Sequence, residues 1–191
     1  MELTEKDRAM NILIVDDSPA DRLWLLTHLR AAGFHRLLLA ESARDALRQL
    51  GVSGFSRLEA EVDTILMDCE MPDLDGIQAC ALIRRAPDLR EVPLILATAH
   101  ADAKKLEEAF AAGVTDYITK PYNAIELMAR LRMALRLRQA INERKERERE
   151  WECRTLRDSL TGIANRHYFE QQLDAEWRRA LRSRSPLSVI L

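Results

Sequence analysis

The sequence lacks the features of a membrane-spanning or exported protein. Its longest apolar runs fall well short of the roughly 18 residues that a membrane span needs. The first segment, Met1 to Arg8, is charged and has no apolar stretch of the kind that a signal peptide contains. We therefore expect no association with a membrane.

The sequence also has few cysteines and no net positive charge. The three cysteines, Cys69, Cys80 and Cys153, are odd in number and show no metal-binding spacing, which favours a reducing cytoplasm. The formal net charge of −2 over 191 residues leaves no excess of basic side chains for a nucleic-acid partner. A cytoplasmic protein that does not bind nucleic acid is the expected class.

Four short strand-like runs each end in polar side chains. They are residues 12–15 before Asp16 and Asp17, 64–67 before Asp68, 94–97 before Thr98, and 117–119 before Lys120. Amphipathic helical segments separate the runs, and strands alternating with helices predict a parallel sheet with right-handed crossovers. In such a sheet these side chains would meet at one edge, where α/β proteins place their functional sites.

The order of segments defines the predicted domain. Strands are expected at 11–16, 37–39, 64–67, 94–97 and 117–119, and helices at 18–32, 42–50, 76–85, 103–112 and from 123 onward. Gly51 to Ala60 is predicted to be a loop of unusual length. We expect a doubly wound α/β domain with a five-stranded parallel sheet over residues 9–137.

The acidic groups at the sheet edge suggest a chemistry. Two carboxylates about 4 Å apart repel by about 4 kcal/mol at an effective dielectric constant near 20, so either a pKa rises or a cation binds. Oxygen ligands alone favour Mg²⁺. With Mg²⁺ at Asp16, Asp17 and Asp68, and with Thr98 and Lys120 to hold further oxygens, Asp68 could act as a nucleophile in phosphoryl transfer.

These motifs together resemble the receiver domain of a two-component response regulator. The matching features are Asp16-Asp17, Asp68 with Met71-Pro72 and Asp75-Gly76 after it, Thr98, and Tyr117 ahead of Lys120-Pro121. The resemblance extends from about Asn11 to about Leu137. It implies a flavodoxin-like fold and transfer of a phosphoryl group from a sensor histidine kinase to Asp68.

The resemblance also assigns roles to individual residues. Mg²⁺ would be held by Asp17, Asp68 and the backbone carbonyl of Glu70, with Asp16 acting through water. Thr98 and Tyr117 would form a switch pair that responds to the phosphoryl group. The Lys120-Pro121 peptide is often cis in this family.

The last predicted helix continues beyond the expected domain. No glycine or proline occurs from Asn123 to Arg157, a stretch of roughly 50 Å if it is helical throughout. Heptad spacing relates Leu127, Leu131, Ala134 and Ile141, and Arg138 interrupts it. Two interpretations are open for residues 138–157: a solvated single helix held by i,i+4 ion pairs, or a coiled-coil stalk that joins the receiver in a homodimer.

Residues 158–166 resemble the opening motif of the diguanylate cyclase (GGDEF) domain, which converts GTP to cyclic di-GMP. We expect residues 158–191 to be the first part of such a domain, with a helix after residue 166 and a strand beginning at 187. A strand that has just begun suggests a truncated second domain whose active site is absent from this chain. The predicted function is a phosphorylated receiver that controls dimerisation and activity of a C-terminal cyclase.

Other functions fit the pattern less well. A receiver-only interaction module could recruit a partner through the stalk. A haloacid-dehalogenase type phosphotransferase also uses a strand-end aspartate, but its nucleophile ends the first strand and a second aspartate stands where this chain has Glu70. His100 is expected to be a surface residue and Cys69 a buried filler.

Overall fold

The structure is a computed structural model that describes residues 4–52, 61–100, 102–156 and 166–183, together with Pro186 and Ser188. Its elements follow one another in the order α1 (Glu5–Arg8), β1 (Ile12–Val15), α2 (Pro19–Ala31), β2 (Leu37–Ala40), α3 (Ala43–Gln49), β3 (Thr64–Asp68), α4 (Gly76–Arg85), η1 (Pro87–Leu89), β4 (Leu94–Thr98), α5 (Ala103–Ala111), β5 (Asp116–Thr119), α6 (Ala124–Leu156) and α7 (Arg166–Ser183). Contacts divide the chain into two units, 1–141 and 142–191.

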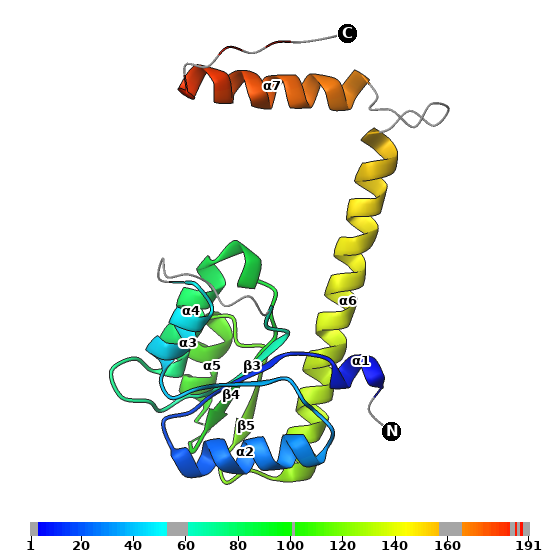
Figure 1. Ribbon diagram of the computed structural model, residues 1–191. Helices are drawn as coiled ribbons and strands as arrows, with labels where there is room; N and C mark the ends of the chain where they lie inside the picture. Colours follow the sequence, from blue (N-terminus) through cyan, green and yellow to red (C-terminus); the bar gives the residue numbers. More distant parts are fainter. Residues whose placement is uncertain are drawn as a thin grey trace. The chain divides into compact units, whose positions relative to one another are not determined.

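The first unit is built on one parallel sheet (Figure 1). Its strand order is β2-β1-β3-β4-β5, and every neighbouring pair is parallel. All five predicted strands are present, and the predicted flavodoxin-like fold is confirmed. The central strands β1, β3 and β4 are buried along their whole length, as expected of strands covered on both faces.

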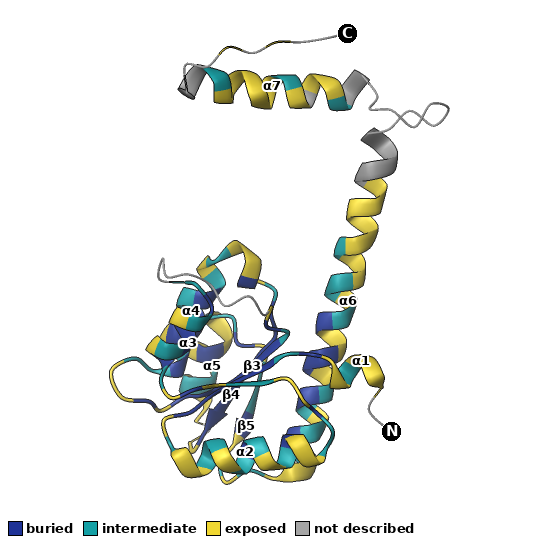
Figure 2. Ribbon diagram, viewed as in Figure 1, coloured by how far each residue is buried: buried dark blue, intermediate teal, exposed yellow. Residues whose placement is uncertain are grey.

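Helices cover both faces of this sheet (Figure 1). On one face, α3, α4 and α5 pack against the sheet through small and aliphatic side chains such as Ala46, Cys80 and Ala109. On the other face, α2 packs through Leu25 and Leu29, and α6 through its first turns. Figure 2 shows the resulting pattern, with buried strands between helices that are exposed on their outer sides. The sheet is therefore fixed between two cores, and the ends of its strands remain accessible to form a site.

Local signals in the sequence set where the helices begin. Ser18 and Ser42 cap α2 and α3, each accepting a backbone N–H three residues on, as predicted. Gly76 starts α4 so close to β3 that a Cβ there would collide with the backbone oxygen of Asp68 and lie 2.9 Å from Leu96 Cδ1. Glycine at this position therefore lets α4 begin directly against the end of β3.

The heptad-spaced residues in the first half of α6 do not form a seam for a second helix. Leu127, Leu131 and Ala134, which were assigned to a heptad seam, are buried in the core between α6 and the sheet. Arg138, which interrupts that spacing, is also buried and places Nε 3.4 Å from Oδ1 of Asp63. These positions therefore belong to the core of the first unit and are not available to a second copy.

The second unit is polar over the part that the structure describes. Within α6, Arg144 and Glu148 form the predicted i,i+4 pair, with 3.7 Å between Nε and Oε1, and Trp151 is 73% exposed. Helix α7 contains a further i,i+4 pair between Asp174 and Arg178, at 2.7 Å. The motif at 158–165, the strand predicted from 187 and most of the loop at 51–60 lie outside the described residues.

Two short elements were not predicted from the sequence. Helix α1 precedes β1, and the loop expected between Pro87 and Pro93 contains the 3₁₀ turn η1.

Among the described residues, no helix combines the length and the apolar character that crossing a membrane requires.

Candidate active site

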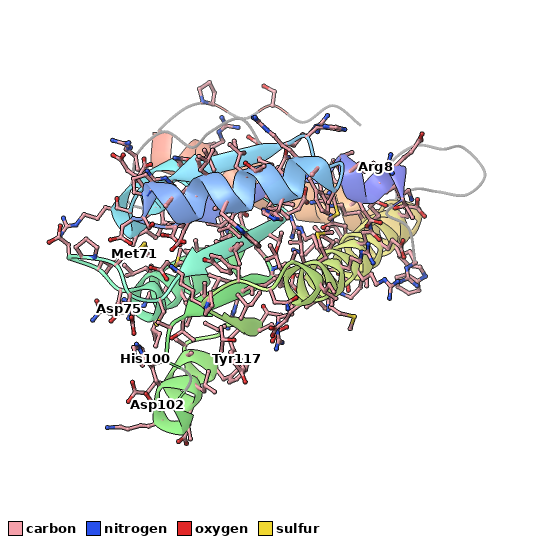
Figure 3. The ribbon with its side chains drawn as sticks, turned by 90° about the horizontal axis from the view of Figure 1, so that it is seen from below. Arg8, Met71, Asp75, His100, Asp102 and Tyr117 are labelled. Atoms are coloured by element: carbon pink, nitrogen blue, oxygen red, sulfur yellow. The ribbon has the colours of Figure 1, made fainter. Side chains whose placement is uncertain are left out.

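The predicted residues meet at the carboxyl edge of the sheet. Asp16 follows β1, Asp68 and Thr98 are the last residues of β3 and β4, and Lys120 follows β5. In Figure 3 the labelled Met71, Asp75 and His100, from the loops after β3 and β4 and the start of α4, lie at this end of the molecule, while Arg8 lies at the other. Parallel pairing thus produces the convergence expected from the sequence.

An acidic cluster forms at this edge. Asp16, Asp17 and Asp68 each offer a carboxylate oxygen, and these oxygens lie within 4.8 Å of one another. Asp16 and Asp68 are buried, whereas Asp17 is exposed. Burial, together with repulsion from Asp16 and Asp17, raises the pKa of Asp68 above its usual value, although Lys120 opposes the shift.

The Lys120 ammonium neutralises part of this charge. Its Nζ lies 2.9 Å from Asp16 Oδ2, 2.9 Å from Asp68 Oδ1 and 3.1 Å from Asp21 Oδ2. Burial by itself would lower the pKa of Lys120, but the hydrogen bonds to Asp16 and Asp68 outweigh it and raise the pKa, so the side chain stays charged. Each of the three ammonium protons can thus point at a different carboxylate.

Two residues of this arrangement were missed from the sequence. Asp21 stands in the first turn of α2 and contacts Lys120, and the Tyr122 hydroxyl lies 3.3 Å from Asp16 Oδ2. Neither follows a strand directly, which is the signal that identified Asp16, Asp68, Thr98 and Lys120. Their places in the sequence do offer a hint, since Asp21 lies in the first turn of α2, directly after the Asp16-Asp17 pair, and Tyr122 lies two residues after Lys120.

The predicted switch residues lie on adjacent strands and have other partners in this structure. The buried Thr98 hydroxyl donates to the backbone oxygen of His100 at 2.9 Å and accepts its backbone N–H at 3.2 Å. The Tyr117 ring packs edge-on against Phe110, and the Arg130 guanidinium lies 5.3 Å from the ring centroid. In this structure Thr98 is therefore hydrogen-bonded to the backbone of His100, and Tyr117 packs against Phe110 and Arg130.

Glu70 borders the site through an ion pair with α5. Its Oε1 accepts a hydrogen bond from Lys105 Nζ at 2.6 Å and lies 3.6 Å from His100 Nδ1. The hydrogen bond with Lys105 holds the pKa of the Glu70 carboxyl below its usual range. His100 is exposed and Cys69 is buried, as the sequence predicted. The Lys120-Pro121 peptide is cis.

The residues present fit a hard divalent cation. All the clustered donors are carboxylate oxygens, which Mg²⁺ prefers, and the exposed Asp17 leaves one side open to water and ligands. Three carboxylates compete for the Lys120 ammonium and Asp17 adds a fourth negative charge, so the site retains excess negative charge without a metal. A cation would relieve the repulsion from Asp16 and Asp17 that adds to the effect of burial on the Asp68 pKa.

Comparison with known proteins gives two family matches. The family model of the response regulator receiver domain matches residues 12–132. The model of the diguanylate cyclase GGDEF domain matches residues 155–191. The first match contains every residue of the site described above, and the second begins at the end of α6.

Relatives of known name share the first of these segments. The chain is 39% identical over 117 residues to the signal transduction histidine-protein kinase BarA of Shigella flexneri, covering 61% of this chain and 12% of that kinase. It is 35% identical over 150 residues to the cyclic di-GMP phosphodiesterase response regulator RpfG of Xanthomonas campestris pv. campestris, covering 78% of this chain and 38% of that protein. The chain thus spans between about an eighth and two fifths of the length of these relatives.

A solved structure supports the same comparison. The receiver domain of sensor histidine kinase PA1611 from Pseudomonas aeruginosa PAO1, with a magnesium ion coordinated in its active-site cleft, is 32% identical to this chain with a TM-score of 0.58. The likeness covers 66% of this chain and 97% of that domain.

Proposed function

Because the chain belongs to the response regulator receiver family and carries a segment that matches the GGDEF domain, we propose that it accepts a phosphoryl group on Asp68 from a sensor histidine kinase. The observation that carries this proposal is the placement of Asp68. Its carboxylate lies at the end of β3 beside Asp16 and Asp17, with Lys120 at 2.9 Å. These are the groups that a phosphoryl-transfer site needs for positioning and charge compensation.

The reaction is a transfer between two side chains. A carboxylate oxygen of Asp68 forms a bond to phosphorus as the bond from phosphorus to the kinase histidine nitrogen breaks, and the product is an acyl phosphate on Asp68. The Lys120 ammonium contacts Asp16, Asp21 and Asp68, so it can keep two of these contacts while its third N–H turns to donate a hydrogen bond to a phosphoryl oxygen. The ammonium therefore compensates charge on the phosphoryl group without leaving the site.

Magnesium fits the same residues. Asp16, Asp17 and Asp68 would hold it with the backbone carbonyl of Glu70, which lies two residues beyond Asp68 in the loop after β3. When bound, the ion supplies positive charge to the phosphoryl oxygens and orients them. The carboxylate side chains of this chain set where that charge is placed.

Thr98 and Tyr117 are proposed as the switch that reports phosphorylation. The Thr98 hydroxyl would exchange its hydrogen bond with the His100 backbone for one with a phosphoryl oxygen. Tyr117, on the adjacent strand, would turn inward and leave its contact with Arg130 of α6. The switch would thus connect the phosphorylation site with the helix that continues into the second unit.

Phosphorylation of the purified 191-residue chain tests the proposal. With MgCl₂ and acetyl phosphate, intact-mass analysis should show one added phosphoryl group, and Asp68→Asn should show none. Asp73→Asn, at an exposed position in the loop after β3, serves as the matched control and should be labelled like the wild type. Labelling that persists in Asp68→Asn would refute the assignment of the acceptor.

We further propose that the signal controls dimerisation through the receiver and the helical stalk, and so the activity of a GGDEF cyclase. Support comes from the large apolar side chains that α6 exposes, among them Ile125 at 83% and Met133 at 62%, and from the GGDEF match that begins at residue 155. Sedimentation with and without beryllofluoride, a phosphoryl mimic, should show increased self-association with the mimic. A monomer at high concentration in both conditions would contradict this part and favour the alternative, a receiver-only module that recruits a partner through its stalk.

A further inference from the structure

Asp16 is held by donors on both of its carboxylate oxygens. Oδ1 accepts the backbone N–H of Ser18 at 2.9 Å, and Oδ2 accepts Lys120 Nζ at 2.9 Å and the Tyr122 hydroxyl at 3.3 Å. Asp16 is fully buried, so the direction of its carboxylate depends on these protein donors. Lys120 and Tyr122 share one oxygen and therefore act on Asp16 together.

Tyr122 also faces the cation of the site. Lys120 Nζ lies 5.6 Å from the centroid of the Tyr122 ring, within the range of a cation–π interaction. The ring is stacked on Trp24 of α2 with 5.4 Å between centroids and 20° between planes, and Trp24 is stacked on His28 at 3.7 Å. One side chain thus contacts the buried anion and the ammonium, and an aromatic stack on α2 fixes its plane.

The geometry also sets the direction of this hydrogen bond. The Tyr122 phenol has an O–H to donate, and Asp16 Oδ2, 3.3 Å away, is a carboxylate oxygen that accepts. The hydroxyl therefore adds a donor to the acidic cluster without adding a negative charge.

We propose that Tyr122 is a positioning residue for phosphoryl transfer: its hydroxyl holds Asp16, its ring holds the Lys120 ammonium, and Trp24 holds the ring. The inference rests on the proposed phosphorylation of Asp68. Lysine has a flexible four-carbon stem, so its ammonium must be kept in place when one of its contacts shifts from Asp68 to a phosphoryl oxygen. Contacts with Tyr122 and Asp16 restrict that movement before the reaction begins.

Rates of phosphorylation distinguish this role from simple packing. Tyr122→Phe removes the hydroxyl and keeps the ring, and we expect the rate at saturating acetyl phosphate and MgCl₂ to fall about three- to tenfold, the scale of one hydrogen bond. Tyr122→Leu removes the ring as well and should be slower than Tyr122→Phe. The concentration of acetyl phosphate that gives half the maximal rate should stay within twofold, because Tyr122 acts on Asp16 and Lys120 and not on the donor.

The matched control is Tyr168→Phe in α7, which should have the wild-type rate. A Tyr122→Phe rate equal to that of the wild type would overturn the role of the hydroxyl, and an equal Tyr122→Leu rate would overturn the inference as a whole. If the wild-type chain itself takes up no phosphoryl group, the proposed function fails, and that result is distinct from either of these.

Fluorescence supplies a readout that does not depend on phosphorylation. Replacing the exposed Trp151 and Trp177 with phenylalanine leaves Trp24 as the reporter. Magnesium titration should then change the Trp24 emission, because the ion acts on Asp16 and Tyr122 connects Asp16 with the Trp24 ring. Tyr122→Leu in this background should abolish the emission change while magnesium still raises the melting temperature. An emission change of the same amplitude in both proteins would contradict the coupling through Tyr122.

Discussion

Replacing Asp68 with asparagine should stabilise the magnesium-free protein. The substitution keeps the shape of the side chain and removes a buried charge that repels Asp16 and Asp17. Sites that place like charges together commonly lose stability in exchange for function. The difference in melting temperature between Asp68→Asn and the wild type in EDTA therefore measures how much the charge of Asp68 destabilises the folded protein.

The size of the effect follows from the distances. At an effective dielectric constant near 20, a carboxylate no more than 4.8 Å away repels Asp68 by at least about 3.5 kcal/mol, and Lys120 at 2.9 Å attracts it by about 6 kcal/mol. Two repulsions and one attraction nearly cancel, so burial of the charge decides the sign and raises the Asp68 pKa. We expect Asp68→Asn to gain on the order of 1–2 kcal/mol, or about 2–6 °C in melting temperature.

Magnesium should reverse this order. A ligand present at 100 times its dissociation constant stabilises the folded state by about 2.7 kcal/mol, and Asp68→Asn lacks one of the three clustered carboxylates. Melts followed by circular dichroism in EDTA and in MgCl₂ make the comparison, with Asp73→Asn as a control that should follow the wild type. A variant that melts below the wild type in EDTA, or that gains as much from magnesium, would refute the reasoning.

The pH dependence provides a check on the sign. The folded-state pKa of Asp68 lies above the 3.8 of an unperturbed aspartate, so the folded chain holds this proton more tightly than the unfolded chain does. The stability that the protonated Asp68 carboxyl contributes is therefore lost as the pH rises through its folded-state pKa. The advantage of Asp68→Asn in EDTA should therefore grow as the pH rises through the folded-state pKa of Asp68, and it should disappear below about pH 3.8, where the carboxyl is protonated in both states.

Three further outcomes are expected. Gly76→Ala should lower the melting temperature and slow phosphorylation, because the added Cβ collides with the backbone of Asp68; equal melting curves would contradict the close approach of α4 to β3. Arg138→Met should cost about 1–3 kcal/mol in chemical denaturation, since it leaves the Asp63 carboxylate without its cation, and Asp63→Asn in the same background should recover part of the loss. The chain should make no cyclic di-GMP from GTP by chromatographic assay, because its sequence has no two adjacent glycines and so no Gly-Gly-Asp-Glu-Phe type of loop; product formation would contradict this.

Most of the site could be predicted because strand ends are visible in a sequence. A short apolar run that stops at a polar or charged residue marks both the strand and the place where the side chain emerges, which located Asp16, Asp68, Thr98 and Lys120. Tyr122 gave no such signal. Its role depends on the contact between its hydroxyl and Asp16, which lies 106 positions away in the chain. The sequence indicates a turn after β5, but it does not show which side chains lie next to Tyr122 after that turn.

Helix α6 shows why periodicity alone could not identify a dimer seam. A row of apolar residues with near-heptad spacing is produced equally by a helix that packs on a sheet and by one that packs on a second helix. Leu127 and Leu131 belong to the first case, since both are buried in the receiver. The charged residue in that row, Arg138, is explained by Asp63 on the loop before β3, a partner 75 positions away in the chain.

The contacts of Arg130 limit how strongly a movement of Tyr117 could affect α6. Arg130 on α6 lies over the Tyr117 ring and also bonds Asp116 at 2.6 Å and Glu126 at 2.8 Å. Movement of Tyr117 would remove one of these three partners and leave both ion pairs in place. Because partly exposed ion pairs contribute little and a single cation–π contact about 0.5–1 kcal/mol, the bias that this contact can exert on α6 is small. A signal of that size can shift only an equilibrium that is already nearly balanced, which is the condition that a weakly associating, largely polar stalk would meet.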